Sequence, residues 1–550
     1  MEIQLFNKYR FTNPIRIISC YSREDIRFCF DQIETALESG YYAAGFASYD
    51  ENSSIPLIWF GIFEKPNDID ETKSYKTGKY KVTNLHKNIS KKEYINKISR
   101  IKRLIESGST YQVNYTFKYK FDFSGSTERL YTDLKKLQQT DYSAFIKTDK
   151  FSILSLSPEL FFEKKGEDIT VRPMKGTSYQ DAGFLQKDPK NMSENIMIVD
   201  LMRNDLGRFC KTGSVAADKL FCVEKFKTIC QMTSEICGKI KTKTSLYDLF
   251  QSIFPSGSVT GAPKTSTINI IKELEKEDRN IYTGCIGFFT PNKDAIFNIA
   301  IRTILIKGKR GEMGIGSGIV YDSDPEKEFD ECDLKAGFLK IASTDFELIE
   351  TLLWNKNKGF FLLKYHLERL INSADYFGID IDINNLKLRL NKLKKRLNPQ
   401  KSHKVRITAA KNGKTMITSS ILSQNKTGNK ISLSEKRVNS DDIFLYHKTT
   451  RRELYDREYK ICLKKGYTDV IFTNERGEIT EGAISNLIVK KNGNYFTPPI
   501  GSGLLNGIYR RYFIKNNQTK EKTLFLDDLL NADKIYICNS VRGIREIIIV

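Results

Sequence analysis

Histidine, tryptophan and paired cysteine are scarce in this sequence. Only 4 histidines and 2 tryptophans occur among 550 residues, and the 10 cysteines are scattered without a Cys-x-x-Cys pair. That spacing favours neither a zinc site nor a disulfide framework, so we expect reduced cysteines in the cytoplasm. No uninterrupted apolar run of about 18 residues occurs, and the first residues lack the pattern of a signal peptide. We therefore expect no membrane anchor.

Acidic residues are also fewer than basic ones: the sequence has 67 aspartates and glutamates and 88 lysines and arginines, which gives a formal net charge of +21. The excess is spread along the chain. Its densest stretch, at 387–399, has leucines at helical spacing, which predicts an amphipathic helix with a solvated basic face. These are Leu386, Leu388, Leu390, Leu393 and Leu397. A nucleic-acid partner is therefore not expected, although the positive field suits small anionic substrates.

The chain is too long for one ordinary domain, and 40% hydrophobic residues can form a core in each of two or three. The first half alternates strand-like and helical patterns, which predicts a mixed α/β domain. Its predicted strands are 153–156 and 296–306, and its predicted helices are 92–107, 193–202 and 266–275. After residue 343 the pattern starts afresh with a strand, a glycine turn and a helix at 364–377. We predict two domains, 1–343 and 344–550.

One lysine, Lys175, stands between a Pro-Met pair and a glycine in the stretch VRPMKGTS. The neighbouring turn residues place it where a strand ends, and a solvated surface lysine is the simplest reading. Glu159 follows a Ser-Pro corner in SLSPELFFE shortly before it. A hairpin between the two would bring both side chains to one cavity.

Three further stretches accompany this pair. SENIMIVDLMRNDLGRFC predicts a helix with Glu194 in its first turn, and FPSGSVTGAPK is a glycine-rich loop that can offer backbone N–H groups to an anion. GIGSGIVYDSDPEKEFDECDLKA couples alternate glycines to Glu328, Glu331 and Lys335, the last two on one helical face. Taken singly, these patterns are equally typical of a helix-start charge, a simple turn and a surface ion pair.

Together, in this order, these motifs resemble those of the chorismate-utilising enzymes, and within that family the aminodeoxychorismate synthase group. The resemblance runs from GFASYD at Gly45 through GSTYQVNYT to about Lys340. It implies a large antiparallel α/β sandwich with a buried cavity. It also implies Mg²⁺ held by hard carboxylate oxygens, for which the matching residues are Glu194, Glu331 and Glu328.

The resemblance further implies that Lys175 is a nucleophile on C2 of chorismate and that Glu159 is the acid that expels the C4 hydroxyl. Ammonia then enters at C4. Anthranilate synthases carry alanine in place of this lysine. An amine nucleophile and a protonated carboxyl both require burial, so we expect both side chains to be buried. The positions that match substrate contacts are Thr260, Arg302, Gly316, Gly318 and Lys335.

The second half carries the motifs YHKTTRRELYD, NERGEITEGAISNLIV and GSGLLNGIYR. A surface lysine and a turn carboxylate would explain Lys448 and Glu481 individually. Their order resembles the fold-type IV pyridoxal-phosphate enzymes, which include aminodeoxychorismate lyase and the branched-chain aminotransferases. The resemblance implies that Lys448 bonds to the cofactor and that Glu481 faces its ring nitrogen. The positions that match phosphate contacts are Arg369, Ser485, Asn486, Gly507, Ile508 and Ser540, and Arg406 matches a substrate-carboxylate contact.

The two resemblances together imply that chorismate is aminated and that pyruvate is then eliminated to leave 4-aminobenzoate for folate synthesis. The sequence has no Gly-x-Cys-x-Gly nucleophile motif, so we expect ammonia from a separate glutamine amidotransferase subunit. The fold-type IV resemblance also implies a homodimer through the second domain. An anthranilate-type first domain with a branched-chain or D-amino-acid aminotransferase-like second domain stays an alternative.

Overall fold

The computed structural model describes the whole chain except residues 51–52, 70–77, 139, 179–187, 226–229 and 424–427. The described residues divide into two compact units, Met1–Ser343 and Thr344–Val550. Within these described ranges, no helix combines the length and the apolarity that a membrane crossing needs.

The first unit is a sandwich of two antiparallel sheets, each of ten described strands. The first sheet runs in the order β16 (Gly261–Ala262), β8 (Gln112–Gly125), β20 (Arg310–Ile319), β19 (Thr303–Lys307), β10 (Ser152–Ser157), β9 (Tyr142–Lys147), β1 (Glu2–Leu5), β2 (Tyr9–Thr12) and β6 (Asn67–Asp68), with β7 (Tyr80–Lys87) also on β8. The second runs β13 (Met174–Ser178), β15 (Cys230–Lys239), β12 (Asp168–Arg172), β11 (Leu160–Lys165), β18 (Ala295–Ile299), β17 (Cys285–Phe289), β4 (Tyr42–Ala47), β5 (Ile58–Phe63) and β3 (Arg16–Cys20), with β14 (Ala216–Lys225) also on β15.

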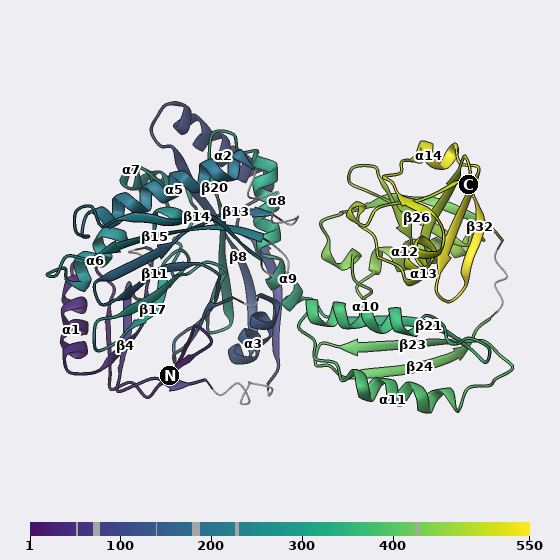
Figure 1. Cartoon of the computed structure of the whole chain (residues 1–550), viewed down its shortest axis with the longest axis horizontal. Helices are drawn as coiled ribbons and strands as arrows, with labels where there is room; N and C mark the ends of the chain where they lie inside the picture. Colours follow the sequence, from purple (N-terminus) through teal and green to yellow (C-terminus); the bar gives the residue numbers. More distant parts are fainter. Residues whose placement is uncertain (51–52, 70–77, 139, 179–187, 226–229, 424–427) are drawn as a thin grey trace. The chain divides into compact units, whose positions relative to one another are not determined.

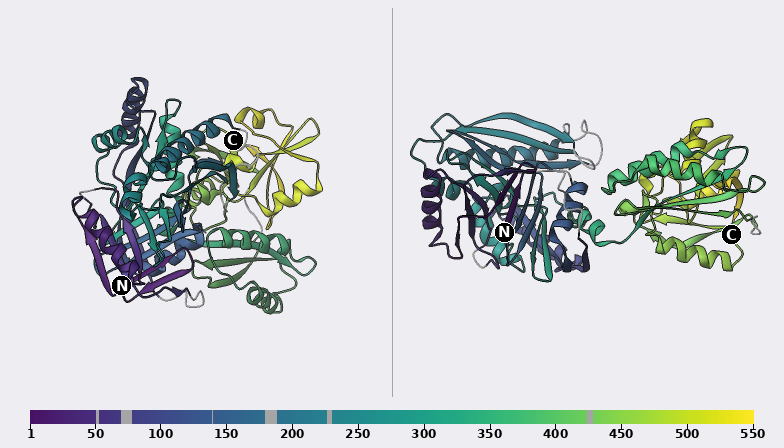
Figure 2. Two further views of the ribbon diagram at one scale, coloured as in Figure 1. Left: turned by 60° about the vertical axis from the view of Figure 1, so that its left-hand side comes forward. Right: turned by 90° about the horizontal axis from the view of Figure 1, so that it is seen from below.

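Apolar side chains of both sheets form one core between them. Helices cover the outer faces of the sheets (Figures 1 and 2). Phe11 of the first sheet packs on Phe63 of the second at 5.2 Å between ring centroids. Each such fully buried side chain contributes roughly 1.5–3 kcal/mol. Buried apolar residues of helices α1 (Ile26–Glu38) and α6 (Leu246–Ile253) pack against the second sheet and form a second core with it. The remaining helices among the described residues of this unit are α2 (Lys91–Glu106), α3 (Thr127–Gln138), α5 (Pro189–Gly207), α7 (Lys264–Leu274), α8 (Pro325–Lys335) and α9 (Gly337–Ser343).

Local capping explains where the helices that carry site residues begin. The side chain of Asp188 accepts a hydrogen bond from Asn191 N before α5, and the side chain of Asp324 accepts from Glu326 N and Lys327 N before α8. Both helices then have proline at their first position, where its missing N–H costs nothing. Because α5 begins at Pro189, Glu194 lies in its second turn and not in its first as the sequence predicted.

The predicted strand 296–306 is wrong as one element. It is split into β18 in the second sheet and β19 in the first, and the chain crosses between the sheets at Ala300–Arg302. Arg302 takes the left-handed conformation there, with φ +49°. Lys175 lies near the start of β13, three residues after β12 ends, and not at the end of a strand as the sequence predicted. Leu388 is 62% exposed on the outer face of its helix.

The second unit contains a four-stranded and an eight-stranded sheet within its described residues. The smaller has the order β22 (Gly359–Phe360), β21 (Glu347–Asn355), β23 (His403–Ala410) and β24 (Thr415–Ile421). The larger has the order β27 (Ile479–Gly482), β26 (Asp469–Asn474), β25 (Lys430–Val438), β32 (Gly543–Ile549), β31 (Lys534–Asn539), β28 (Asn486–Lys491), β29 (Asn494–Thr497) and β30 (Thr519–Glu521). Its helices are α10 (Leu363–Tyr376), α11 (Ile383–Lys394), α12 (Glu453–Lys464), α13 (Ile508–Asn516) and α14 (Leu526–Leu530).

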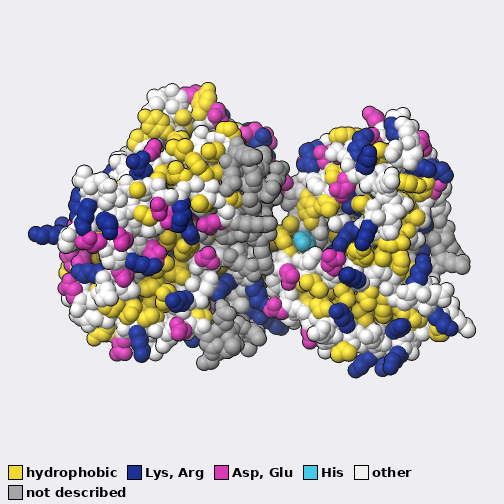
Figure 3. Space-filling model, viewed as in Figure 1, with side chains coloured by type: hydrophobic (Ala, Val, Ile, Leu, Met, Phe, Trp, Pro, Cys, Tyr) yellow, Lys and Arg dark blue, Asp and Glu magenta, His cyan; other side chains and the backbone are white. Residues whose placement is uncertain are grey.

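Basic side chains are scattered over the face of the molecule drawn in Figure 3, among acidic and apolar ones on both units. This distribution agrees with the diffuse spread of lysine and arginine along the sequence.

Candidate functional site

The expected hairpin between Glu159 and Lys175 is present. Strands β11 and β12 pair antiparallel, with Leu160 opposite Arg172, so the residue before β11 and the strand after β12 come together. Glu159 is 3% exposed, and Ser258 Oγ donates a hydrogen bond of 3.0 Å to its Oε1. Burial raises the pKa of Glu159 to about 7, and the hydrogen bond from Ser258 and the charge of Lys175 act against this rise. The carboxyl can therefore carry a proton near neutral pH.

Lys175 is half-buried, so the expectation of burial is met fully by the glutamate and partly by the lysine. Desolvation lowers the pKa of Lys175, and the positive charge of Lys335 lowers it further. The carboxylates of Glu194, Glu159 and Glu331 act in the opposite direction. The structure thus brings the predicted nucleophile, the predicted acid and two predicted metal ligands into one electrostatic cluster.

Alternate glycines on β20 make room for this cluster. Gly314, Gly316 and Gly318 share one face of the strand because side chains alternate. A Cβ at Gly318 would lie 2.9 Å from Lys175 Nζ and 2.5 Å from Gln112 Nε2, and a Cβ at Gly314 would lie 2.2 Å from the ring of Tyr282. Gln112 and Tyr282 are buried, and the sequence reasoning missed both.

Replacing Gly318 with alanine tests this placement. The new methyl group meets the flexible ends of the Gln112 and Lys175 side chains, so we expect a folded protein whose turnover falls roughly ten- to hundredfold, since small displacements of a reacting group are costly. Thermal unfolding should barely change.

The matched control is Gly316→Ala. Its Cβ would lie 2.5 Å from the backbone oxygen of Tyr115, so we expect a loss of stability of about 1–3 kcal/mol. Equal loss of stability in both variants would show that Gly318 is needed for the strand and not for Lys175.

Carboxylates of α8 complete the cluster. Lys335 Nζ lies 2.8 Å from Glu331 Oε1 and donates to the carbonyl of Gly316 at 3.2 Å, so the predicted pair on one helical face is confirmed. Glu328 Oε1 accepts a hydrogen bond of 2.9 Å from Ser323 Oγ. Glu194 on α5 and Glu331 on α8 thus offer hard oxygen donors from two helices beside Lys175, a donor type that suits Mg²⁺.

A buried ion pair fixes the glycine-rich loop. Arg279 is 1% exposed in its side chain, pairs with Glu275 at 2.7 Å and donates to the carbonyls of Val259 and Asn114. It therefore ties the loop to β8 and sets the position of Ser258 against Glu159. Thr260, the residue predicted from the motif, donates its hydroxyl to Ser256 O at 2.9 Å.

Arg302, a predicted substrate-binding residue, contacts a side chain of α3. Its Nη1 donates to Gln138 Oε1 at 2.7 Å, at the end of α3. The predicted contact of this guanidinium with a substrate carboxylate stays a prediction.

A cavity of about 890 Å³ lies in the second unit, with Lys448 and Glu481 in its lining. This is within the size range of cofactor and ligand pockets. Burial lowers the pKa of Lys448 to about 8, and the positive charges of Arg452 and Arg369 add to that effect. Burial raises the pKa of Glu481 to about 8, although Leu505 N and Asn486 Nδ2 each donate to its carboxyl at 3.1 Å.

Arg369 is held in the same cavity by a buried carboxylate. Its Nε and Nη2 donate to the two oxygens of Glu350 at 2.8 Å each, and Nη1 donates to Asn506 O. Glu350 is 1% exposed, and Arg369 together with His366 holds its pKa near 2 despite burial. This fork orients the guanidinium with N–H groups left for a ligand.

The other predicted cofactor residues surround the cavity. Ser485 Oγ donates to the buried Asp469, and Ser540 Oγ donates to Thr351 O at 3.2 Å. Gly507 precedes α13 and Ile508 begins it, so backbone N–H groups of that helix end lie in the lining. Arg406 is exposed on β23 and also lines the cavity.

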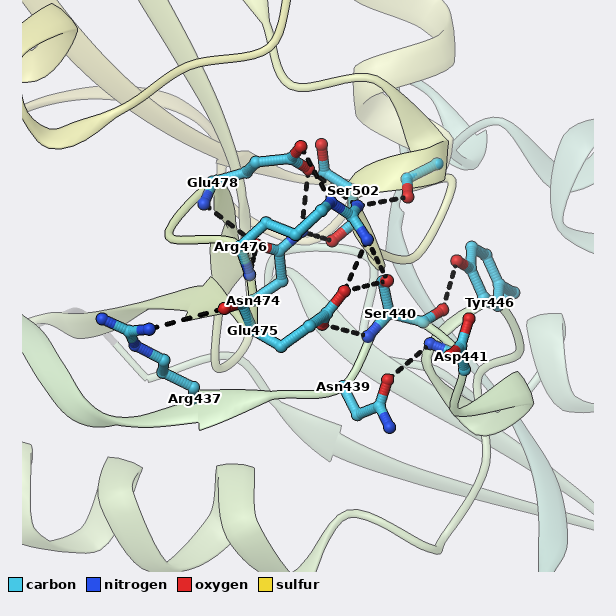
Figure 4. A network of polar contacts seen from close by, with 11 residues as sticks. Arg437, Asn439, Ser440, Asp441, Tyr446, Asn474, Glu475, Arg476, Glu478 and Ser502 are labelled. Carbon is cyan, nitrogen blue, oxygen red and sulfur yellow. Dashed lines mark hydrogen bonds and ion pairs between the residues drawn. The ribbon is translucent and has the colours of Figure 1, made fainter. Parts of the chain in front are cut away.

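A polar network fixes the segment that leads to Lys448 (Figure 4). Ser440 donates from its N and Oγ to Glu475 at 2.8 and 2.6 Å, and Tyr446 OH donates to Ser440 O at 2.6 Å. Arg476 donates to Ser440 Oγ and forms a two-pronged pair with Glu478. The segment is therefore held on the β26–β27 turn, which positions the lysine two residues after Tyr446.

Two buried hydroxyls of the cavity lining, Thr449 Oγ1 and Tyr455 OH, lack a hydrogen-bond partner among the described residues. Leaving such groups unpaired costs free energy, so they mark places for polar atoms of a ligand. Together with the amine, the carboxyl and the helix end, they fit a phosphorylated aromatic aldehyde such as pyridoxal phosphate.

Comparison with known proteins agrees with this architecture. Residues 23–340 match the family model for chorismate binding enzymes. This chain belongs to that family. Residues 347–550 match the model for amino-transferase class IV, so the second unit is a domain of that type.

The chain resembles two related groups of the family almost equally. It is 37% identical over 248 residues to aminodeoxychorismate synthase component 1 of Bacillus subtilis, covering 44% of this chain and 53% of that protein. It is 34% identical over 274 residues to anthranilate synthase component 1 of Saccharolobus solfataricus, covering 48% and 65%. The matches thus span about half to two thirds of those relatives.

A solved structure supports the fold of the first unit. Anthranilate synthase component I from Streptococcus pneumoniae superposes with a TM-score of 0.53 at 24% identity, over 61% of this chain and 91% of that one.

Proposed function

We propose that the first unit aminates chorismate to 4-amino-4-deoxychorismate and that the second unit eliminates pyruvate from it to give 4-aminobenzoate. The observation that carries the proposal is the position of Lys175 beside Glu159. Relatives named as aminodeoxychorismate synthase and as anthranilate synthase are similarly close. The lysine decides between them, because ortho amination needs no amine nucleophile at that position.

The chemistry of the first unit follows from these two side chains. Lys175 Nζ, as a free amine, bonds to C2 of chorismate while the two conjugated ring double bonds each shift by one position and the C4 oxygen leaves as water with a proton from Glu159. Ammonia then bonds to C4, both double bonds shift back, and the lysine leaves as a free amine. Lowering the pKa of Lys175 and raising that of Glu159 are the shifts that this step needs.

Mg²⁺ would be held by Glu194 and Glu331, with Glu328 on the same helix as the third predicted carboxylate. A bound cation there supplies charge for the ring carboxylate of chorismate. Lys335 and the N–H groups around Gly316 and Gly318 lie beside this position and bind the same end of the substrate.

Pyridoxal phosphate fits the cavity of the second unit, and when bound it supplies an electron sink for the bond-breaking step. Lys448 would bond to it and Glu481 would face its ring nitrogen. Arg369, Ser540 and the start of α13 would hold the phosphate, and Lys448 Nζ would move the ring proton of the substrate.

The proposed function implies a supply of ammonia. The name component 1 of the relatives implies a second component, and we propose a separate glutamine amidotransferase as that partner.

Product analysis tests the whole proposal. The chain is given chorismate, Mg²⁺, ammonium and pyridoxal phosphate, and the products are separated. We expect 4-aminobenzoate and pyruvate. Anthranilate as the main product would reject the proposal in favour of the ortho alternative.

The pH dependence of the amination reports on Glu159. The acid form is required and the pKa is about 7, so the rate should fall as the pH rises through about 7. Ser258→Ala removes a hydrogen bond that lowers this pKa, so the falling limb should move to higher pH. A limb that stays in place in Ser258→Ala would mean that another group carries the proton.

A further inference from the structure

A positively charged residue at the start of α12, Arg452, lines the cavity that contains Lys448 and Glu481. Arg452 precedes this helix, and its Nη2 donates to Ala483 O at 2.6 Å, two residues beyond Glu481. Its Nε pairs with Asp456 at 2.7 Å, one turn along the helix. Two anchors on different elements therefore fix a guanidinium that is 22% exposed at the cavity wall.

This inference rests on the proposed function, in which Lys448 and Glu481 must both be deprotonated. The lysine must be a free amine, and the glutamate must take a negative charge beside the ring nitrogen. In an apolar cavity the neutral state of each group is favoured, so burial helps the amine and opposes the carboxylate. A single fixed cation near both groups favours the amine and the carboxylate at once.

We propose that Arg452 is a positioning residue of this kind, which favours the amine form of Lys448 and the carboxylate form of Glu481 from its anchored place on Ala483 and Asp456. The other charges that act on Lys448 come from Arg369, Glu350 and Glu481. Glu350 is buried and bound to Arg369 through both oxygens, whereas Asp456, the partner of Arg452, is 54% exposed in its side chain. Among the electrostatic contributions to the lowered pKa of Lys448, that of Arg452 is the largest.

The neighbouring Arg451 offers a matched control. It lines the same cavity, but its guanidinium lies 4.3 Å from the centroid of Phe444 and 3.6 Å from Asp442. It carries the same charge without the contact to Ala483. If any positive charge in the cavity lining acted on Lys448, removing either arginine would change its titration equally. If the anchored position matters, only the loss of Arg452 changes it.

The experiment measures the titration of Lys448 directly in the full chain without cofactor. The protein is labelled briefly with a lysine-reactive aryl ester at a series of pH values, and the labelled fraction of the Lys448 peptide is read by mass spectrometry. We expect a midpoint near 8 in the original protein and about one pH unit higher in Arg452→Gln. Arg452→Lys and Arg451→Gln should stay near the original midpoint.

An unchanged midpoint in Arg452→Gln, or an equal rise in Arg451→Gln, would overturn the proposal. Near-ultraviolet circular dichroism identifies a variant that has lost its fold. If Arg452→Gln is lost in this way, Arg452→Lys decides, since a midpoint about one pH unit above the original in a folded variant that keeps the charge would contradict the proposal. Because no cofactor or substrate is present, the result does not depend on whether the second unit is a lyase.

Discussion

Lys175→Ala is expected to abolish formation of 4-amino-4-deoxychorismate. The substitution removes the nucleophile while Glu159, the carboxylates of α5 and α8 and the glycines of β20 remain, so chorismate and Mg²⁺ should still bind. Loss of a covalent nucleophile typically lowers turnover by about a thousandfold or more. Product analysis with chorismate, Mg²⁺ and excess ammonium measures the effect. Because ortho amination needs no amine nucleophile at this position, a trace of ortho product in this variant would agree with the proposal.

Lys164→Ala is the matched control for this experiment. Lys164 lies on β11 of the same sheet, burial lowers its pKa too, and its Nζ donates to Lys293 O at 2.7 Å. Its loss should cost stability and leave the product unchanged. If Lys175→Ala still formed the para product at the original rate, the nucleophile would have to be another group and the assignment of the first unit would fail.

Much of the first site was accessible from sequence because its parts are local. Glu159 and Lys175 are joined by one hairpin, and Glu331 and Lys335 by one helical turn, so spacing alone predicted that each pair would meet. The crossing at Arg302 was not accessible. Residues 296–306 are mostly apolar because both sheets bury their strands, and the few polar residues among them, Asn298, Arg302 and Thr303, are also compatible with one long strand. The pattern therefore did not reveal where the chain changes sheets.

The residues that were missed reach the site from distant parts of the chain. Gln112 comes from β8, Ser258 from the glycine-rich loop and Tyr282 from the segment before β17, and only the assembled sandwich shows that they face Lys175, Glu159 and Gly314. The alternate glycines of β20 were a usable signal, since a strand face without side chains requires something large to pack on it. In the second unit, motif order identified the cavity. It did not predict the hydrogen bond from Asn486 to Glu481, which lies five residues before it on the other side of the β27–β28 turn.

Lys448→Ala is expected to separate the two activities. The units are compact by themselves, so the first should continue to aminate chorismate while the second loses the amine that bonds to the cofactor and moves the proton. We expect 4-amino-4-deoxychorismate to accumulate and the release of pyruvate to fall by about a thousandfold or more. Borohydride reduction of the original protein with pyridoxal phosphate should label the Lys448 peptide, and the variant should carry no such label.

Lys490→Ala controls for the loss of a lysine in the same unit. This residue lies on β28 and its Nζ is 5.5 Å from the ring centroid of Tyr495, on a strand apart from Lys448. It should keep both the label and pyruvate release. Continued pyruvate release in Lys448→Ala at the original rate would mean that this cavity does not catalyse the elimination, even with the amination intact. Loss of amination in the same variant would instead show that the first unit depends on the second, which two independent cores do not predict.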